Sequence, residues 1–576
     1  MDIVMIDEIE KEALAAFQTS PFSAYGRLLK VSLEYFGGNV CPFQGCLVVG
    51  MQHMLGTTVD MFQVMKRLGL EQAVVGSKLY SDSQICIEAF KKLGYNHVGC
   101  QEPTGYGLYN ESIVKDIHKI WENALQVIKN RSIDSIIIFD DGADLLLNIP
   151  NEIYRLCRSK GLFLVGIEQT RGGSNRTFFN GLPLPIINVA GAGIKNRFEY
   201  QWVAKEVVRI LSKDSLYNIE LQLGRKPRIG IIGYGVMGHA IVNELSQRAF
   251  QISIYDSKAA SVSENSAVTH LSNAVVLVSG ADVIIGCTGT DVTANQAVFD
   301  ALHYSSTPKW LVSASSKDLE FNYLLHKYQE QITQKYCTPD VLQTVVYRNY
   351  YGSAISLLRG GFPINFQNTI HSVSPEKIWP TRAGLLLASL MALKYRKALT
   401  KTSTVYQLDP WAQMLIYHHY AQIHPADPQL ESLSTLSDQE LCQYFCKYSQ
   451  GKPLHQYEGI YGASALTLSH MPCHAYIKDF NGVYLDCNDQ FIQASGFGFR
   501  RAIIGKTDQE LWPLSSSRLQ FIDRQVVEKQ KQVIQIEKVE TKEGIGTYLS
   551  TKMPFYSKGK LIGIIGNSIP VLDISF

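Results

Sequence analysis

The stretch KPRIGIIGYGVMG at residues 226–238 decides the fold that we expect for the middle of this chain. Its apolar run, residues 228–232, has the length and composition of a buried strand, and residues 239–248 follow a helical pattern. A second strand, FQISIYD, is expected at 250–256. A strand, a glycine-rich turn, a helix and another strand are the parts of a parallel α/β sheet. Residues 226–256 therefore predict a βαβ unit.

The turn of this unit has three glycines in the pattern G-x-G-x-x-G. Gly233 permits the tight turn, Gly235 lets the backbone approach a pyrophosphate, and Gly238 allows the helix to pack closely on the strand. The helix that begins at Val236 and Met237 offers unpaired backbone N–H groups to the phosphates. Because the pattern follows a strand and opens a helix, it predicts a dinucleotide site.

Asp256 ends the second strand of the unit, about 20 residues after Gly235. A carboxylate at this position accepts hydrogen bonds from the adenosine ribose of NAD. It also disfavours the 2′-phosphate of NADP, because two such charges about 4 Å apart repel by ~1–4 kcal/mol at effective dielectric constants of about 80 to 20. We therefore predict NAD as the cofactor, and Lys258 leaves NADP open as an alternative.

The composition is that of a folded protein with several domains. Of 576 residues, 46% are hydrophobic and 18% charged, and a typical size of ~100–200 residues per domain suggests roughly three to five domains. The 54 Lys and Arg residues nearly balance the 52 Asp and Glu residues. The resulting net charge of +2 disfavours a nucleic acid or an anionic membrane as the partner.

Neither a signal peptide nor a membrane span is expected. The amino terminus turns acidic where a signal peptide needs a basic start, and no segment approaches the ~18 apolar residues of a spanning helix. The eleven cysteines form no CxxC pair, and His418, His419 and His424 fit a polar helix face better than a metal site. We therefore expect a cytoplasmic protein with reduced thiols and no metal.

Strand-like runs alternate with helix-like stretches through about residue 390, which predicts parallel α/β architecture. The expected strands outside the βαβ unit are 45–51, 71–77, 134–142, 161–167, 184–191, 281–289 and 309–315. Between about 400 and 460 the pattern becomes helical and polar, with breakers at 424–429 and 450–453. This stretch predicts a linker that carries helices.

The carboxy-terminal part predicts a small α+β domain with an antiparallel sheet. Two alternating runs flank Asn481-Gly482, a strong hairpin signal, and a second strand pair flanks Gly559. The run MPCHAYIKDFNGVYLDCNDQF at 471–491 and the closing hairpin resemble a PAS domain of the kind found in bacterial sensor proteins. Asn488-Asp489 is expected to cap a helix, and we expect structural roles for Cys487 and His474.

Four further segments carry a resemblance to an enzyme family. They are CLVVGMQHMLGTTVDMFQVMKRLGLEQAVVGSKLYSDSQ (46–84), IIIFDDGADLL (136–146), GIEQTRGG (166–173) and PIINVAGAGIKNRFEY (185–200). Together with the GYGVMG turn, their order resembles that of the S-adenosyl-L-homocysteine hydrolase family, over about residues 40–390. That family oxidises the 3′-hydroxyl of its substrate with tightly bound NAD, eliminates homocysteine, adds water and reduces the ketone again.

The resemblance implies a role for residues of the first part of the chain. His53 matches the family's acid/base histidine, Thr58 a threonine that contacts substrate, and Asp141 the carboxylate at the sugar. Lys195 matches the lysine beside the 3′-hydroxyl, and burial or a neighbouring cation is expected to lower its pKa enough for base work. Glu199 stands where the family has an aspartate. Singly, each of these residues also fits a structural role.

Further positions follow from the same resemblance. Thr288-Gly289 matches the loop on the nicotinamide side, and Asn365 the asparagine of a late strand end. Gln169 takes the place of a substrate-binding glutamate, unless a gap moves that place to Glu168.

The chain departs from the family at several positions. Tyr200 replaces an asparagine, Ala204 replaces a cysteine, and Ser315-Ser316-Lys317 lacks a histidine. His371 falls one residue from a late histidine, and another domain stands in place of the family's basic tail. Elimination and water addition are therefore less well supported than the first oxidation.

These observations predict a two-lobed α/β unit of the adenosylhomocysteinase type followed by a PAS-like α+β domain. The expected domains are a substrate-binding domain at 1–200, a Rossmann NAD-binding domain at 201–375, a returning helix with a helical linker at 376–460 and the PAS-like domain at 461–576. The expected substrate is a nucleoside or an adenosyl thioether, and the expected partner is a second copy of the chain. A sensor that holds NAD or a nucleoside without turnover is the alternative, and a scaffold with vestigial sites is a weaker one.

Overall fold

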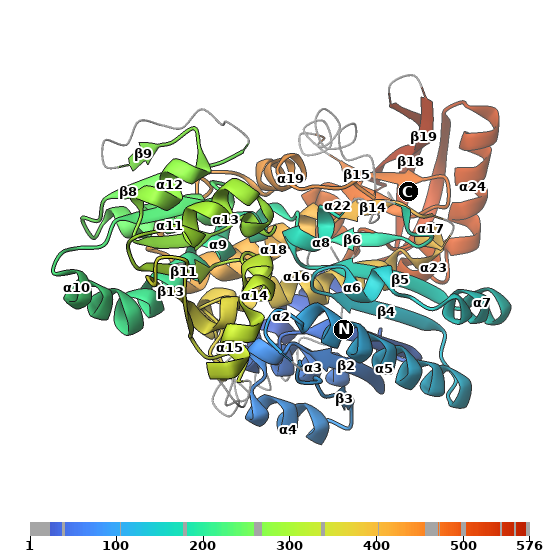
Figure 1. Cartoon of the computed structure of the whole chain (residues 1–576). Coiled ribbons are helices and arrows are strands. Elements are labelled where there is room, and N and C mark those ends of the chain that lie inside the picture. Colours follow the sequence, from blue (N-terminus) through green and yellow to red (C-terminus); the bar gives the residue numbers. More distant parts are fainter. Residues whose placement is uncertain are drawn as a thin grey trace, which may run out of the picture. The chain divides into compact units, whose positions relative to one another are not determined.

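The computed structural model divides the chain into two compact units (Figure 1). One comprises Met1–Ser32 and Val40–Lys452, and the other comprises Leu33–Asn39 and Pro453–Phe576. The structure describes residues 24–36, 41–103, 105–176, 181–257, 268–335, 340–400, 402–454, 471, 473–496, 503–541, 544–557 and 560–571. Lys258 and Gly559, which the sequence singled out, lie outside the described residues.

The first sheet of the larger unit is parallel and has the order β14-β6-β5-β4-β1-β2-β3. Its strands are β1 (Cys46–Gln52), β2 (Gln72–Ser77), β3 (Asn96–Val98), β4 (Ser135–Asp140), β5 (Phe163–Glu168), β6 (Ile186–Asn188) and β14 (Val405–Gln407). Every residue of β1 is buried, which explains its unbroken apolar run. The strand order reverses between β1 and β4, and such a switch point is where ligands bind in open α/β sheets.

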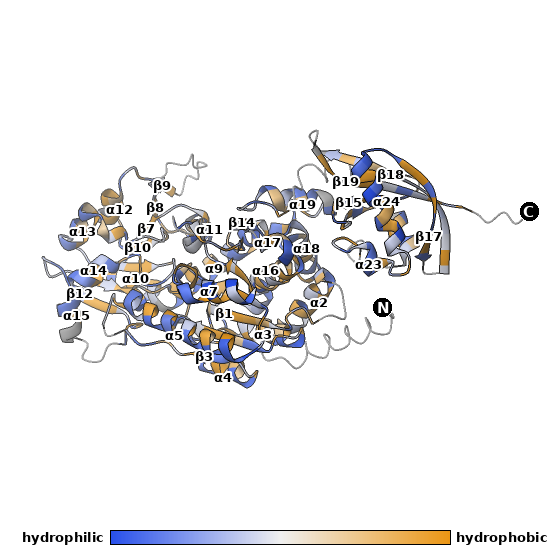
Figure 2. Ribbon diagram, turned by 90° about the vertical axis from the view of Figure 1, so that its right-hand side faces the viewer, coloured by the Kyte–Doolittle hydropathy of each residue, from blue (hydrophilic) through white to orange (hydrophobic). Residues whose placement is uncertain are grey.

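Helices connect and cover these strands. They are α3 (Gly56–Arg67), α4 (Gln84–Lys92), α5 (Tyr109–Asn130), α6 (Asp144–Leu147), α7 (Asn151–Lys160), α8 (Arg171–Ser174) and α16 (Pro375–Lys394), with α2 (Tyr25–Phe36) before them. Helix α5 packs against β1 and β2, and α16 packs against α3 and β5. Figure 2 shows apolar residues along β1 and alternating polar and apolar residues on α4, as expected for a buried strand and a surface helix.

The second sheet of this unit has the order β12-β13-β11-β10-β7-β8-β9, and β12 pairs antiparallel with β13. Its strands are β7 (Ile229–Ile232), β8 (Ile252–Tyr255), β9 (Val268–His270), β10 (Val283–Gly286), β11 (Lys309–Ser313), β12 (Val345–Arg348) and β13 (Ala354–Leu357). Its helices are α11 (Val236–Ser246), α12 (Ala274–Gly280), α13 (Gln296–His303), α14 (Asn322–Lys327) and α15 (Gln329–Lys335), and α10 (Tyr217–Leu223) precedes it. The order β9-β8-β7-β10-β11-β13 is that of the Rossmann fold.

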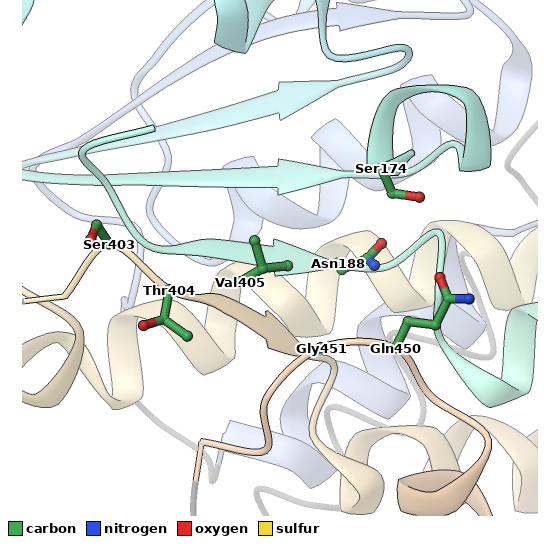
Figure 3. A pocket seen from close by; sticks show the side chains of 7 residues that line it. All are labelled: Ser174, Asn188, Ser403, Thr404, Val405, Gln450 and Gly451. Carbon is green, nitrogen blue, oxygen red and sulfur yellow. The ribbon is translucent and has the colours of Figure 1, made fainter. Parts of the chain in front are cut away.

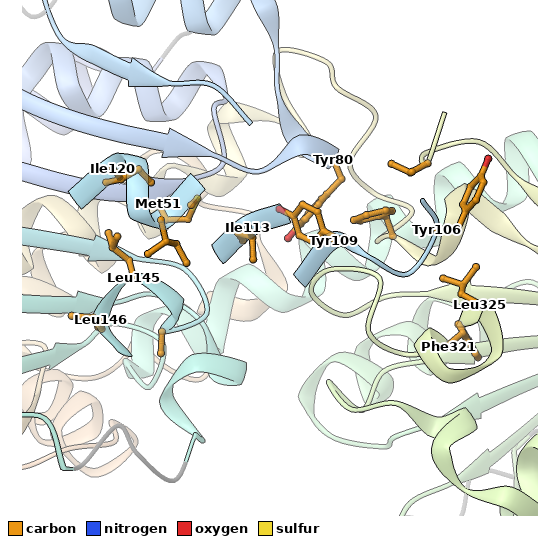
Figure 4. Close-up of a cluster of buried hydrophobic side chains, with 14 of the residues drawn as sticks. Met51, Tyr80, Tyr106, Tyr109, Ile113, Ile120, Leu145, Leu146, Phe321 and Leu325 are labelled. Carbon is orange, nitrogen blue, oxygen red and sulfur yellow. The ribbon is translucent and has the colours of Figure 1, made fainter. Parts of the chain in front are cut away.

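A shared hydrophobic cluster joins the two sheets (Figure 4). The rings of Tyr80 and Tyr109, from the first sheet's side, lie 5.3 and 5.2 Å from the ring of Phe362. Figure 4 also shows Tyr106 beside Leu325 of α14. The two lobes therefore pack through aromatic side chains.

Residues 376–452 belong to the larger unit and differ from the expected linker. Helix α9 (Gly193–Leu211) packs against α16, α18 (Pro410–Ile423) and α19 (Asp438–Lys447), while α17 (Arg396–Leu399) leads to β14. Strand β14 adds to the edge of the first sheet by pairing with β6. With three residues, β14 is too short to give a periodic signal in the sequence.

The second unit is built around an antiparallel sheet with the order β16-β15-β19-β18-β17. Its elements are β15 (His474–Asp479), β16 (Tyr484–Cys487), α22 (Asp489–Ser495), α23 (Asp508–Leu511), α24 (Ser516–Lys529), β17 (Val533–Thr541), β18 (Gly544–Ser557) and β19 (Lys560–Pro570). Gly482 adopts a φ of +75° in the predicted hairpin, and Asn488 accepts a hydrogen bond from the backbone of Phe491 as the expected helix cap. The predicted class, α/β followed by a smaller α+β domain, is confirmed.

Across the part of the chain that the structure describes, no helix combines the length and the apolar character needed to cross a bilayer.

Candidate functional site

Polar side chains meet at the switch point of the first sheet. His53 follows β1, Lys78 follows β2, Asp141 follows β4 and Gln169 follows β5. These four residues form what we call the Asp141 cluster. Parallel strands bring their carboxyl ends to one edge of the sheet, so residues far apart in the sequence converge there. The cluster is almost entirely buried.

Asp141 is the centre of the cluster. Its Oδ1 accepts a hydrogen bond from the Lys78 ammonium, and its Oδ2 accepts one from the Gln169 amide. The Nε2 of His53 lies 3.3 Å from Oδ2. Burial alone would raise the pKa of Asp141, but Lys78 and His53 outweigh it and hold that pKa well below its usual value. Asp141 is therefore an anion in the folded protein.

His53 is held on both ring nitrogens. Its Nδ1 lies 2.6 Å from the Ser81 hydroxyl, and its ring stacks on Phe366 with centroids 4.3 Å apart. Burial lowers the pKa of His53, and the Asp141 carboxylate offsets that effect only in part. The ring is thus neutral near pH 7 and able to accept a proton.

Lys195 lies beside the cluster at the start of α9. Its Nζ donates to the backbone carbonyl of Gln169 and stands 3.2 Å from the Glu199 carboxylate. Glu199 also accepts a hydrogen bond from Thr381 of α16. Burial would lower the pKa of Lys195, but Glu199 outweighs it and raises that pKa. The expected lowering of this pKa is therefore wrong, because the helix places a carboxylate one turn away.

Glu168 and Asp140 hold the loops around the cluster. Glu168 accepts hydrogen bonds from the backbone N–H groups of Gly142, Ala143 and Thr170. Burial raises the pKa of Glu168 to about 8 and that of Asp140 to about 7. The side chain of Gln169 contacts Asp141, whereas that of Glu168 binds backbone N–H groups. Of these two neighbouring residues, Gln169 is therefore the one that faces Asp141.

Thr58 lies near the cluster without facing it. Its hydroxyl donates to the backbone carbonyl of His53 at 2.7 Å, so it fixes the loop after β1. The preceding Thr57 instead contacts Arg382 of α16. Sequence reasoning missed Lys78 and Arg382. A polar residue directly after a neighbouring strand is the signal that could have found Lys78, whereas Arg382 lies in an apolar helical stretch and gives none.

The glycine turn has the geometry expected of a dinucleotide site. Gly233 adopts a φ of +96°, and a Cβ there would lie 2.8 Å from the carbonyl carbon of Cys287. A Cβ at Gly238 would lie 2.0 Å from the Gly233 oxygen, so α11 packs directly on the turn. A Cβ at Gly235 would meet no atom of the described residues within 4 Å. The backbone at Gly235 is thus open to a ligand.

The other predicted cofactor residues surround this turn. Asp256 follows β8 and accepts a hydrogen bond from the Tyr234 N–H at 2.6 Å, while Val236 is exposed and Met237 is partly buried. The backbone N–H of Gly289 and the hydroxyl of Thr288 bind Glu320, at 2.6 and 2.9 Å. Asn365 is buried and follows Pro363, which pairs with Ser313 in an isolated parallel β-bridge. Residues from β7, β8, β10 and β11 therefore gather at the second switch point.

The positions that depart from the resembled family have other partners here. Tyr200 is partly buried and has a raised pKa, and Ala204 lies in the core under the second sheet. Lys317 adopts a φ of +63° and pairs with Asp144 at 2.5 Å. The hydroxyl of Thr369 donates to the backbone carbonyl of His371.

The histidine cluster and the described cysteines give no metal centre. His418 pairs with Asp438 at 2.7 Å, and His424 contacts the backbone carbonyl of Glu376 at 2.9 Å. Within the described ranges, no group of three His, Cys, Asp or Glu side chains is arranged to hold a metal ion.

Two hollows lie elsewhere. A pocket of about 460 Å³ at the β6–β14 edge is lined by Ser174, Asn188, Ser403, Thr404, Val405, Gln450 and Gly451 (Figure 3). These residues carry no acid or base, so this pocket lacks the groups for proton transfer. A cavity of about 40 Å³ in the second unit is lined by aromatic, aliphatic and polar residues, including Glu537 and Glu540, and has room for only a few water molecules.

Comparison with known proteins identifies two domains. Residues 228–336 match the NAD binding domain of 6-phosphogluconate dehydrogenase, and residues 468–573 match the PAS fold. The larger unit therefore contains an NAD-binding domain for a nicotinamide cofactor, and the second unit is a PAS domain. These parts of the resemblance are confirmed, and the relation to S-adenosyl-L-homocysteine hydrolases stays a prediction.

The curated relatives are two uncharacterized proteins of Mycobacterium tuberculosis, from strains CDC 1551 / Oshkosh and ATCC 25618 / H37Rv. Both are 25% identical over 332 residues, which are 56% of this chain and 60% of theirs. The chain thus spans less than two thirds of the length of these relatives.

Among solved structures, VqmA bound to DPO is 26% identical over 19% of this chain and 56% of that chain, with a TM-score of 0.18. The NADPH-dependent glyoxylate/hydroxypyruvate reductase of Sinorhizobium meliloti in complex with citrate is 14% identical over 54% of this chain and 92% of that chain, with a TM-score of 0.31.

Proposed function

We propose that the chain is an NAD-dependent enzyme that oxidises the 3′-hydroxyl of an adenosyl or related ribosyl substrate, as in the first step of an adenosylhomocysteinase-like reaction. The observation that carries the proposal is the buried set of acid, base and cation at the first switch point. Helix α9 connects this set to the cofactor domain, because Lys195 stands in its first turn and the helix packs against α11. The amino end of α11 forms the glycine turn.

In this proposal Lys195 and Glu199 move the proton of the alcohol. The nicotinamide, when bound, supplies the hydride acceptor. The Glu199 carboxylate lies 3.2 Å from the Lys195 ammonium and raises its pKa, so Lys195 stays charged. The carboxylate can take the proton of the 3′-hydroxyl while the ammonium stabilises the alkoxide that forms, and such base catalysis typically contributes a factor of about 10²–10⁴.

Asp141 and His53 have separate roles. The Asp141 anion accepts hydrogen bonds from the sugar hydroxyls and so fixes the ring. His53, buried and neutral, is the proton acceptor for the step after oxidation. Tyr200, Ala204 and Gln169 replace residues that the resembled family uses, so we expect the later steps to be slow.

The test is a single-turnover experiment with the full chain. NAD-loaded protein is mixed with adenosine or S-adenosylhomocysteine, and NADH absorbance is followed. We expect reduction of the bound NAD and slow release of homocysteine. Rapid homocysteine release would show that Tyr200, Ala204 and Gln169 do not slow the later steps.

Lys195→Ala should slow the reduction by about 10²–10³-fold, because the forming alkoxide loses its charged hydrogen-bond donor. Lys205→Ala is the matched control, since Lys205 is exposed on the same helix. Equal rates for the Lys195 variant and the control would contradict the role of Lys195.

A sensor that binds NAD or a nucleoside without turnover is the second candidate. Lys78 and Gln169 occupy both carboxylate oxygens of Asp141, so a sugar hydroxyl must displace one of them before it can bind there. This observation favours the sensor. This candidate predicts that ribosides raise the melting temperature without forming NADH. The PAS domain would then report the bound state.

A further inference from the structure

Arg382 is a buried cation beside the Asp141 cluster. It lies in the middle of α16, and its side chain is 5% exposed. Its Nη1 donates to the side-chain oxygen of Gln52 at 3.1 Å, and its Nε lies 3.5 Å from the Thr57 hydroxyl. Gln52 is the residue before His53, so the guanidinium is next to the site. Both of these partners are neutral.

Arg382 lacks the ion pair that two other buried cations of the site have. Lys78 pairs with Asp141, and Lys195 pairs with Glu199. Arg382 has no carboxylate of the described residues within 4.0 Å. Two further buried carboxylates beside the cluster, those of Glu168 and Asp140, accept hydrogen bonds from backbone N–H groups instead. A buried charge without a counter-ion is costly, and proteins pair such charges or use them for binding.

The surroundings of Arg382 increase this cost. Thr57 is the second residue of α3, and the amino end of a helix carries a partial positive charge. A guanidinium placed there is repelled by the helix, whereas an anion placed between the two would be attracted by both. Burial accordingly lowers the pKa of Arg382, although Asp141 and Glu199 act in the opposite direction.

We propose that Arg382, together with the backbone N–H of Thr57 in the first turn of α3, binds an oxyanion of the substrate, a carboxylate or a phosphate. The inference rests on the proposed function for the ribosyl part and adds that the substrate carries a negative group within reach of α16. An arginine presents parallel N–H donors that match the two oxygens of such a group. The anion supplies a contacting counter-charge in place of the neutral partners that Arg382 has among the described residues.

The test compares three probes on the NAD-loaded full chain: adenosine, adenosine 5′-monophosphate and adenosine 5′-carboxylate. Affinity is measured by titration calorimetry and oxidation by NADH absorbance. We expect at least one anionic probe to bind about 10-fold or more tightly than adenosine. The probe with the greater advantage tells phosphate from carboxylate. Equal affinities for all three would overturn the inference.

Arg382→Gln should remove the advantage of the anionic probe and leave the affinity for adenosine unchanged. Arg382→Lys should retain part of it, because the charge stays and the paired donors are lost. Arg396→Gln is the control, since Arg396 is a partly exposed arginine paired with Asp134 at the opposite end of β4. A preference for the anion that survives in Arg382→Gln would overturn the inference.

Two readouts separate the possible failures. Removal of an unpaired buried charge should leave the melting temperature unchanged or raise it, so a clear drop in Arg382→Gln would assign Arg382 a structural role instead. Anion binding through Arg382 without NADH formation would refute the proposed function alone. NADH formation from adenosine without any anion preference would refute the oxyanion site alone.

Discussion

Gly235 shows how a single residue can reserve space for a ligand. A Cβ at Gly233 or Gly238 would overlap backbone atoms, whereas one at Gly235 would meet no described atom within 4 Å. The absence of a side chain at Gly235 is therefore not required by the packing of the protein around it. It is explained by a pyrophosphate that must approach the backbone at this point.

We expect Gly235→Val to fold and to lose at least 10-fold in NAD affinity, because the side chain would stand between the backbone donors and the phosphates. Gly280→Val is a matched control, since a Cβ at Gly280 also meets no described atom within 4 Å. Melting curves and titration with NAD check both claims. Undiminished NAD binding by Gly235→Val would place the cofactor elsewhere.

Glu168 makes the stability of the larger unit depend on pH. Its pKa is raised from 4.5 to about 8 by burial, so the folded protein holds a proton that the unfolded chain releases at lower pH. The stabilisation from this proton is complete below pH 4.5 and is lost as the pH rises towards 8. Asp140, with a pKa of about 7, acts in the same direction.

We therefore expect the melting temperature to contain a component that falls between pH 5 and about pH 8 and that Glu168→Gln reduces. An amide cannot ionise and keeps an acceptor for one of the Gly142 and Ala143 N–H groups, which bind different oxygens of Glu168, so the slope of the melting temperature with pH is compared and not its absolute value. Melting temperatures measured across this range for both proteins give the two slopes. Parallel slopes would mean that Glu168 is ionised in the folded protein.

At the scale of elements, the site is made by strand ends and completed by two helices. The strand ends were predictable, because β1, β4 and β5 are long apolar runs that stop at His53, Asp141 and Gln169. Lys195 and Glu199 of α9 were predicted as well, but the part from α16 was not, since Thr381 contacts Glu199 from 182 residues further along the chain and Arg382 follows it. Only the packing of α16 against α3 and α9 brings those side chains to the site.

The expectation that the pKa of Lys195 is lowered was incorrect because it left out a neighbour on the same helix. Burial was foreseeable from the resemblance, and burial alone lowers the pKa of a lysine. The sign depends on Glu199, whose position one turn along α9 places its carboxylate 3.2 Å away. A helix register of four residues therefore decides the protonation state, and the sequence reveals it only once the helix boundary is known.

At the scale of the whole molecule, the PAS domain has the means to fold on its own. It has a separate core around Tyr476, Tyr484 and Trp512. Lys478 also pairs with Asp508 at 2.6 Å and with Asp523 at 2.9 Å inside this domain. A domain of this size can bury an adequate core, so residues 453–576 should form a cooperatively folded fragment.

The outer face of its sheet favours self-association. Ile536 pairs across the strands with Leu549, and Leu549 pairs with Ile569, so the three form one apolar row. Their exposed fractions are 55%, 42% and 53%. Large apolar side chains that adjoin on an exposed face mark a contact surface, and a second copy of the chain would cover the row with its own.

We therefore expect the 453–576 fragment to be folded and dimeric, and Leu549→Lys to make it monomeric, because the charge would be buried at the centre of the row. Leu514→Lys is the control, since Leu514 is 84% exposed and lies outside the sheet, before α24. Circular dichroism reports folding, and sedimentation equilibrium gives the mass of each fragment. A folded monomer would refute the association alone, whereas an unfolded fragment would show that the PAS domain depends on the rest of the chain for its stability.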